Sequence, residues 1–391
     1  MKILFLNWNG YGNRDIIDAF NRMSDEGKDI SLSVYPFDAH TARDDWQFID
    51  SFSQDIRKET PDFVFSYNYF PAVSVACQKE GIRYVSWVYD SPAVVLYSYT
   101  LINSCNSVYL FDSQMYEDFA SKGIKTVHYL PLAAPVSRYD RIELTKEERD
   151  TWGARISFVG GLYNDRGNFY DRIKDKISDY SRGYVEGLMR AQMEIDGLSI
   201  VESSLIKPVL DDMVKALELR PNADGVESEE YLYSNYVLDR KITSMERSEI
   251  LSMIGEKHPL DLYTNDSSFA KAGVNNKGII DYYDEMPKVF KASDINLNIT
   301  LRSIQRGIPL RAMDIMGCGG FLLTNYQEDM LRFFDPGEDF VYYESRQDLM
   351  DKIEFYLEHE EERRRIAENG YSKVCSSHTL DQRLEEIIDQ L

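Results

Sequence analysis

Three arginines, Arg302, Arg306 and Arg311, lie within ten residues of one another in the last third of the chain. The whole chain has 44 Lys and Arg against 66 Asp and Glu, a formal net charge of −22. Pro309 lies among the arginines and suits the first turn of a helix, whose N-terminal end carries the positive end of its dipole. These features predict a site for an anionic group such as a phosphate. Arginines that only face water are the alternative.

A carboxylate follows in the same predicted helix. Asp314 lies about one and a half turns from the helix start. It could accept hydrogen bonds from both hydroxyls of a ribose whose phosphates lie at that start, as an acidic residue does in Rossmann sites. Gly317, Gly319 and Gly320 would then end the helix and let the next strand pack closely. A solvated acid in a helix-to-strand turn is the alternative.

A second candidate loop follows an apolar run at 155–159. Gly160 and Gly161 end that predicted strand, and Arg166 follows at the start of the next segment. Glycines at a strand end followed by a cation suit a diphosphate. Arg166 could instead pair with Asp165 or Asp171 at the surface.

A third candidate loop follows the first predicted strand. Gly10 and Gly12 would allow close backbone approach to a ligand, with a helix N-terminus behind them. Asp15 stands where a dinucleotide fingerprint has its third glycine, so the signal for NAD is weak. A glycine turn without a ligand is the alternative.

Asp90 is the candidate general base. It follows the predicted strand Tyr84–Val88, in the sequence WVYDSP. A carboxylate at the end of a strand can remove a proton from a hydroxyl group. Asp-Ser-Pro is also typical of turns and helix starts, so both explanations stay open.

The composition argues against several classes of protein. A net charge of −22 repels nucleic acid and anionic lipid. The four cysteines form no Cys-x-x-Cys pair and the five histidines are far apart, so a zinc site is not expected. No apolar run approaches ~18 residues, and the N-terminal run is too short for a signal peptide. We therefore expect a cytoplasmic protein without a transmembrane segment.

Strand-like and helix-like segments alternate through most of the chain, which predicts parallel sheets covered on both faces. At 391 residues, two domains are expected. We predict a Rossmann-like domain at 1–136, a linker at 137–153, a second Rossmann-like domain at 154–376, and a final helix at 377–391 that packs back on the first domain. Residues 169–254 have apolar positions at helical spacing and form a predicted insertion.

Gly278–Ile280 is one of the predicted strands. Two such doubly wound domains would face a cleft between their strand ends.

At the candidate loops and segments described above, the chain resembles a GT-B glycosyltransferase. It resembles the CgeB-like group (named for a spore maturation protein) and, more loosely, glycosyltransferase family 4. The resemblance covers most of the chain except the insertion, and it rests on WVYDSP at 87–92, FVGGLYNDRG at 158–167, RAMDIMGCGGFLLTN at 311–325, and the segments 108–135, 285–300 and 361–383.

The resemblance implies transfer of a sugar, of hexosyltransferase type, from a nucleoside diphosphate sugar, with UDP-sugar favoured and no metal. Asp314 matches the second of two family glutamates, and Arg306 stands at the first, so Arg306 joins Asp90 as a catalytic candidate. Arg302 and Arg311 are donor-site candidates, as is Ile280. Tyr89 stands at a family histidine and Gly161 at a family arginine, so donor sugar and stereochemistry do not carry over.

Two other functions stay open. A nucleotide-sugar epimerase has the same architecture and binds the same donor. A non-catalytic scaffold could use 169–254 as an interaction surface. The acceptor of a transferase could be a protein, a glycan, a lipid-linked glycan or a small metabolite, and no rule reads it from the sequence.

Overall fold

The computed structural model describes residues 1–41, 43–164 and 168–391. The chain divides into two compact units. The first contains Met1–Leu132, Pro221–Glu227 and Leu380–Leu391, and the second contains Ala133–Arg220 and Ser228–Thr379. The predicted linker, 137–153, therefore falls in the second unit, which begins with helices α5 (Val136–Tyr139) and α6 (Lys146–Trp152).

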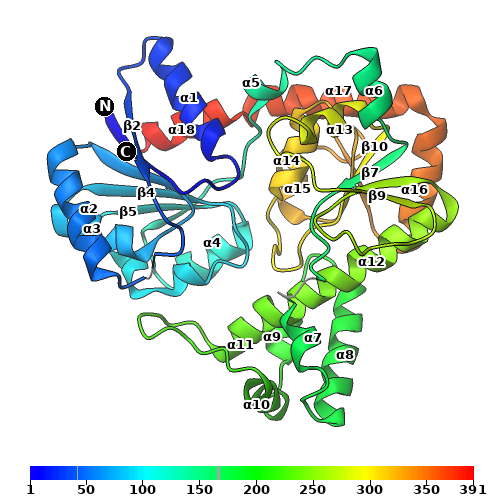
Figure 1. Cartoon of the computed structure of the whole chain (residues 1–391), viewed down its shortest axis with the longest axis horizontal. Helices are drawn as coiled ribbons and strands as arrows, with labels where there is room; N and C mark the ends of the chain where they lie inside the picture. Colours follow the sequence, from blue (N-terminus) through cyan, green and yellow to red (C-terminus); the bar gives the residue numbers. More distant parts are fainter. Residues whose placement is uncertain (42, 165–167) are drawn as a thin grey trace. The chain divides into compact units, whose positions relative to one another are not determined.

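The first unit is built on a six-stranded parallel sheet in the order β2-β1-β3-β4-β5-β6 (Figure 1). All five residues of β3 are buried, as expected for a strand covered on both faces. The edge strand β2 has no buried residue. The strands are β1 (Lys2–Asn7), β2 (Ser31–Pro36), β3 (Phe63–Tyr67), β4 (Arg83–Val88), β5 (Asn106–Leu110) and β6 (Val127–Tyr129). The helices are α1 (Asn13–Asp25), α2 (Trp46–Glu59), α3 (Pro71–Glu80), α4 (Ser113–Ala120), α18 (Leu380–Asp389) and the short turns η1 (Val94–Tyr97) and η2 (Tyr99–Ile102).

The second unit has its own six-stranded parallel sheet, in the order β12-β11-β10-β7-β8-β9 (Figure 1). Two parallel sheets with interleaved helices confirm the predicted pair of doubly wound domains. The strands are β7 (Ile156–Val159), β8 (Leu260–Tyr263), β9 (Val274–Gly278), β10 (Ile295–Asn298), β11 (Leu322–Asn325) and β12 (Val341–Tyr343). The helices that follow β9 are α13 (Met286–Ala292), α14 (Leu310–Gly317), α15 (Glu328–Phe333), α16 (Arg346–Glu358) and α17 (Glu360–Ser377).

The strand predicted at Gly278–Ile280 was misplaced. The strand there is β9, which ends at Gly278, and Ile279 is 75% exposed. β9 reads VNNKG and lies at the edge of the sheet, so it needs no apolar run. The prediction was based on the apolar pair Ile279–Ile280, which lies in the loop after the strand.

The insertion between β7 and β8 is helical, as predicted. It contains α7 (Phe169–Ile173), α8 (Asp179–Met193), α9 (Val201–Ser204), α10 (Lys207–Ala216), α11 (Glu229–Leu232), the π-helical turn η3 (Tyr233–Leu238) and α12 (Asp239–Lys257). The last helix also covers the second sheet, because Ile250, Leu251 and Ile254 belong to the core around β7, β8 and β10. α12 therefore connects the insertion rigidly to the strands.

The C-terminal helix α18 belongs to the first unit. It buries Leu380, Leu384 and Ile387 there. Arg22 of α1 donates hydrogen bonds to both carboxylate oxygens of Asp381, each at 2.9 Å. Apolar burial and a bidentate ion pair thus hold the last helix against the first sheet's helices.

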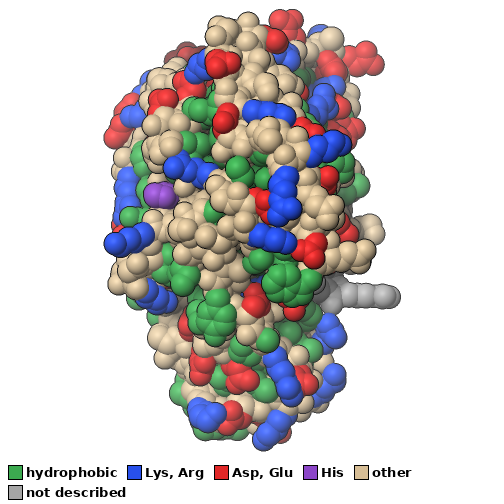
Figure 2. Space-filling model, turned by 90° about the vertical axis from the view of Figure 1, so that its left-hand side faces the viewer, with side chains coloured by type: hydrophobic (Ala, Val, Ile, Leu, Met, Phe, Trp, Pro, Cys, Tyr) green, Lys and Arg blue, Asp and Glu red, His purple; other side chains and the backbone are tan. Residues whose placement is uncertain are grey.

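Charged side chains of both signs reach the surface on the face drawn in Figure 2. On the face in Figure 2, acidic and basic side chains are interspersed and hydrophobic side chains reach the surface between them. In the part of the chain that the structure describes, no helix is long and apolar enough to cross a membrane.

We expect Leu384→Ala to lower the free energy of unfolding by about 2–5 kcal/mol, because it leaves a cavity under α18. Leu384 is 0% exposed, whereas Leu198 is 64% exposed. Leu198→Ala is the matched control and should change stability by no more than about 0.5 kcal/mol. Denaturant titration measures both, and equal effects would mean that α18 adds little to the first unit.

Candidate functional site

The second sheet has a topological switch point between β7 and β10. The chain starts the sheet at β7, continues to β8 and β9 on one side, and then crosses to β10, β11 and β12 on the other. Doubly wound sheets bind ligands outside the strand ends at such a point. Gly160 and Gly161 follow β7 here, and Thr300 to Arg302 follow β10.

A buried arginine from the insertion helix α12 ties these two loops together. Arg247 donates from Nη1 to the carbonyl oxygen of Gly161 and from Nε to that of Ile299, the latter at 3.0 Å. Its guanidinium also lies over the rings of Phe158 and Tyr163, 5.3 and 5.1 Å from their centroids. Arg247 therefore fixes the ends of β7 and β10 relative to each other. Arg166, predicted in the same loop, lies outside the described residues.

Arg247 brings positive charge to the switch point. Burial lowers the pKa of its guanidinium, although an arginine stays protonated in proteins. Among the described residues, no carboxylate forms an ion pair with it. A buried cation whose bonds go to neutral carbonyl groups leaves a positive potential at the surface above it. That potential favours an anionic ligand.

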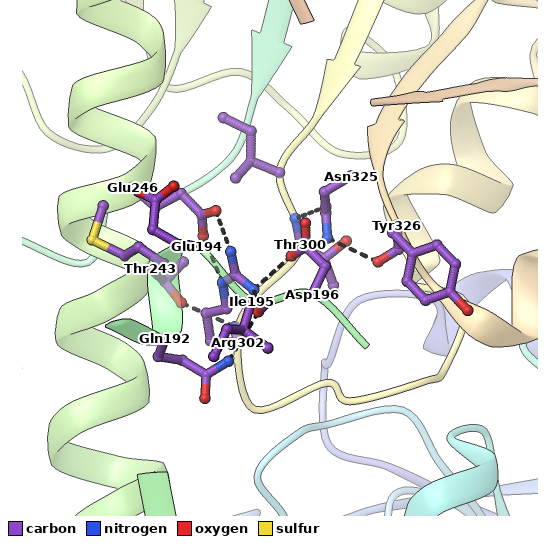
Figure 3. Close-up of polar contacts among 12 residues, drawn as sticks. Gln192, Glu194, Ile195, Asp196, Thr243, Glu246, Thr300, Arg302, Asn325 and Tyr326 are labelled. Atoms are coloured by element: carbon purple, nitrogen blue, oxygen red, sulfur yellow. Dashed lines mark hydrogen bonds and ion pairs between the residues drawn. The ribbon is translucent and has the colours of Figure 1, made fainter. Parts of the chain in front are cut away.

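Arg302, a predicted donor-site residue, is engaged with the insertion instead (Figure 3). Its Nε donates to Glu246 at 2.8 Å and its Nη1 to Asp196 at 2.7 Å. Although burial opposes the charge, these two carboxylates raise the pKa of Arg302. Because both partners are acidic, the charge of Arg302 is balanced within the protein. The side chain joins the loop after β10 to α12 and to the α8–α9 loop.

The other two predicted arginines also have acidic partners. Arg306 forms an ion pair with Glu328 of α15, with 3.1 Å between Nε and Oε2. Arg311 forms one with Asp314, at 3.3 Å. The three arginines are thus brought to the same end of the sheet, but each is paired with a carboxylate. Arg247, by contrast, donates its hydrogen bonds to carbonyl groups.

Asp314 is buried rather than open. Only 1% of the residue is exposed, and the hydroxyl of Tyr139 in α5 donates to its Oδ1 at 2.6 Å. Arg311 contacts the other oxygen. Burial, and then the charge of Asp314, raise the pKa of Tyr139 well above its usual range, so the hydroxyl keeps its proton and donates. A ribose at Asp314 would have to replace the Tyr139 hydroxyl.

Ile280 lies half-buried after β9 and packs against the core that contains α13 and α14. It follows Ile279, whose side chain is 75% exposed. An apolar loop after β9 offers a surface against which a flat ring could pack. The structure thus places Ile280 at the same end of the sheet as Gly160 and Gly161.

The candidate base Asp90 is at the end of β4 in the first unit. Asn68, which follows β3, donates from Nδ2 to Asp90 Oδ2 at 2.7 Å. The amide oxygen of Asn68 accepts from the backbone N–H groups of Tyr89 and Asp90, at 3.0 and 3.3 Å. Asn68 has φ 73°, a left-handed conformation that Asn tolerates. Although Asp90 is exposed, the atoms around it reduce its hydration and raise the pKa of its carboxyl.

The Gly10 and Gly12 loop also belongs to the first unit, whereas the other donor candidates belong to the second. Gly12 precedes α1 with φ 82°, and a Cβ there would lie 2.9 Å from the ring of Tyr67. The Nε1–H of Trp8 donates to the carbonyl of Tyr67 at 2.6 Å. Packing inside the unit therefore accounts for both the glycine and the loop's shape.

The described residues contain no group of three or more His, Cys, Asp or Glu side chains that could hold a metal ion. The carboxylates near the switch point contact arginines instead.

Sequence reasoning missed Arg247 and Glu246. Both are buried on α12, in line with apolar residues one turn away, Ile242, Ile250 and Leu251. A charged pair on an otherwise apolar helical stripe is the signal that could have found them. Their partners, Arg302 and two backbone carbonyls, lie more than fifty residues away and left no trace in the local pattern.

Comparison with known proteins supports one class of fold. A glycosyl transferase-like family model matches residues 247–389, which include β8 to β12. No curated protein sequence matches the chain significantly.

Several solved structures share the architecture. Anabaena HepE in complex with UDP-glucose has a TM-score of 0.56 at 11% identity, with all of both chains covered. Sucrose-phosphate synthase from Thermosynechococcus elongatus has a TM-score of 0.56 at 10% identity, over 100% of this chain and 98% of that one. A UDP-N-acetylglucosamine 2-epimerase homologue from Listeria monocytogenes has a TM-score of 0.52 at 9% identity, over 99% and 94%. These likenesses confirm the predicted GT-B fold.

We expect Arg302→Met to lower the free energy of unfolding by about 3–5 kcal/mol, because it leaves Glu246 buried without its cation. The double variant Arg302→Met/Glu246→Met should recover much of that loss. Arg220→Met is the control, since the exposed Arg220–Glu218 pair should contribute at most about 1 kcal/mol. Denaturant titration compares the three. An Arg302→Met variant as stable as the control would mean that the buried pair does not hold the insertion.

Proposed function

We propose that the protein is a glycosyltransferase that moves a sugar, of hexose type, from a nucleoside diphosphate sugar to an acceptor. The observation that carries this proposal is the glycosyl transferase-like match at 247–389. That stretch begins at Arg247 and includes the loop after β10 and helix α14. The matched residues thus include the strands on both sides of β7.

A UDP-sugar is the favoured donor. HepE of Anabaena binds UDP-glucose on the same fold, although at 11% identity. We further propose that the chain belongs with the CgeB-like group and is more loosely related to family 4, on the motifs WVYDSP and RAMDIMGCGGFLLTN.

The diphosphate would lie at Gly160, Gly161 and the N-terminus of α14. Negative charge develops on the leaving diphosphate as the bond to the sugar breaks. Backbone N–H groups at the strand ends and the helix start can donate to it, and the buried charge of Arg247 stabilises it through the intervening peptide groups. These groups are fixed before the reaction, so they need not reorganise. We propose that the reaction needs no metal ion for this step.

On the first unit, Asp90 would act as the general base in an inverting transfer. Asn68 holds one carboxylate oxygen and leaves Oδ1 for the acceptor hydroxyl. Because the pKa of Asp90 is raised, it lies closer to neutral pH, and the carboxylate is a stronger base than an ordinary aspartate. A retaining transfer would not need this base.

Epimerisation is the second candidate, since the Listeria homologue has the same fold. An epimerase would change the nucleotide sugar without consuming an acceptor. A non-catalytic scaffold would bind no nucleotide, and the buried polar network around Arg302 would then serve stability alone.

The test is a thermal-shift panel with UDP, GDP, ADP and CMP and their sugar conjugates, with and without EDTA. We expect UDP to raise the midpoint whether or not EDTA is present, since a ligand at 100 times its Kd stabilises by about 2.7 kcal/mol. Asp314→Asn should weaken the UDP shift, whereas Tyr139→Phe should not, because it removes only the hydroxyl that a ribose would replace. No shift with any nucleotide would favour a scaffold, and NMR detection of an epimer without added acceptor would favour an epimerase.

We expect Asp90→Asn to leave UDP affinity unchanged and to lower turnover by about 10²–10⁴-fold, the usual contribution of a general base. In the wild type, activity should rise with pH through the raised pKa of Asp90, and the variant should lose that limb. Asp29→Asn, at an exposed acid of the same unit, is the control. Equal turnover in Asp90→Asn and the control would make Asp90 a turn residue.

A further inference from the structure

Seven residues of the helical insertion belong to the first unit. Residues 221–227 lie between α10 and α11, and the helices on either side of them are in the second unit. We refer to residues 221–227 as the clamp. The segment that it contacts is 93–103, which follows Asp90 and contains η1 and η2.

The clamp pairs with this segment through its backbone. Tyr99 N–H donates to the carbonyl of Asp224 at 2.8 Å, and Val226 N–H donates to that of Tyr97 at 3.0 Å. Ser98 and Gly225 thus face each other as an antiparallel, non-hydrogen-bonded pair. Two short segments far apart in sequence form a small ladder of their own.

Charged side chains reinforce the ladder. Arg43 lies 3.3 Å from Asp224 and 3.8 Å from Glu227, and its Nη2 donates to the carbonyl of Val94 at 2.9 Å. The hydroxyl of Ser98 donates to Asp224 at 2.8 Å. Only 14% of the Arg43 side chain is exposed, so water screens these contacts less than at an open surface. One guanidinium therefore links the clamp and the 93–103 segment.

Glu227 gives the clamp a single conformation. Its side chain is 0% exposed, and its Oε1 accepts from both the backbone N–H and the side-chain amide of Asn222. A Cβ added to Gly225 would lie 2.0 Å from Oε2 of Glu227. Because Glu227 is buried and held by Asn222, it cannot swing away into solvent. Position 225 must therefore be glycine as long as the Glu227 carboxylate keeps this position.

The 93–103 segment has an inner side, which packs in the core of the first sheet, and an outer side, which contacts the clamp. Leu96 and Leu101 are 1% exposed and anchor its inner side in the core of the first sheet. Tyr99 and Ile102, which lie on one face of the short η2 turn, are 59% and 66% exposed. Asn106 holds the carbonyl groups of Thr100 and Leu101 from the core, while the ladder and Arg43 hold the segment from the side of the clamp.

We propose that the clamp positions the loop that begins at Asp90, so that the insertion controls the acceptor side of the reaction. This inference rests on the proposed function for its chemistry. Arg43, Asp224 and Glu227 are positioning residues, which act on Asp90 through residues 91–103. The insertion would then set where an acceptor hydroxyl meets the base, while nucleotide binding depends on the second unit.

Gly225→Ala tests the clamp, because the added methyl group displaces Glu227. Gly187→Ala is the matched control: it lies in α8 of the same insertion, and its Cβ would meet no atom within 4 Å. We expect hydrogen exchange of residues 93–103 to become at least about tenfold faster in Gly225→Ala and to stay unchanged in Gly187→Ala. That change corresponds to about 1.4 kcal/mol of opening free energy. Unchanged exchange in Gly225→Ala would overturn the clamp.

Positioning is tested with UDP-glucose hydrolysis, in which water is the acceptor. We expect Gly225→Ala and Arg43→Gln to lower kcat about tenfold or more with KM for UDP-glucose unchanged, and Arg43→Lys to restore part of it. Faster exchange with normal kcat would show a structural contact and reject positioning. A wild-type protein that binds no nucleotide would instead refute the proposed function, while the exchange result would still decide whether the clamp holds.

Discussion

The buried guanidinium of Arg247 is the interaction on which the second unit's candidate site depends. It bonds to the carbonyl of Gly161 after β7 and to that of Ile299 after β10, so one side chain sets the spacing of two loops. Next to it, Glu246 holds Arg302 and through it the second loop again. Removing charge from this pair would leave polar groups buried without partners, which is costly. The insertion helix is therefore a structural part of the end of the sheet at which the candidate site lies.

The two sheets could be predicted because parallel strands buried on both faces appear as short apolar runs between helical segments. β7 is buried along its whole length, and the apolar run at 155–159 predicted it in this way. β9 was misplaced because an edge strand has no such run. The alternation does not determine the order of the strands: the first sheet has the order β2-β1-β3-β4-β5-β6 and the second has β12-β11-β10-β7-β8-β9, so the position of each switch point comes from the structure.

The site was less predictable because pairing between distant residues leaves no local pattern. The arginines at 302, 306 and 311 do gather at one end of the sheet, but the sequence could not show that Glu246, Glu328 and Asp314 balance them. Tyr139 was read as part of a polar linker and proves to donate to Asp314. Sequence reasoning finds residue types at strand ends, whereas burial and partners decide which of them carries free charge.

The course of the chain has a consequence for synthesis. The first unit is assembled from three stretches, and the last of them, residues 380–391 with helix α18, is made after the entire second unit. During translation, the surface of residues 1–132 that contacts Leu380, Leu384 and Ile387 therefore stays exposed until α18 has been made. The clamp also joins this unit only after the insertion has been made. Domains generally fold from the N-terminus as they emerge, but here the N-terminal unit is the last to be completed. The first unit can therefore reach its complete set of contacts only after residues 380–391 have been synthesised.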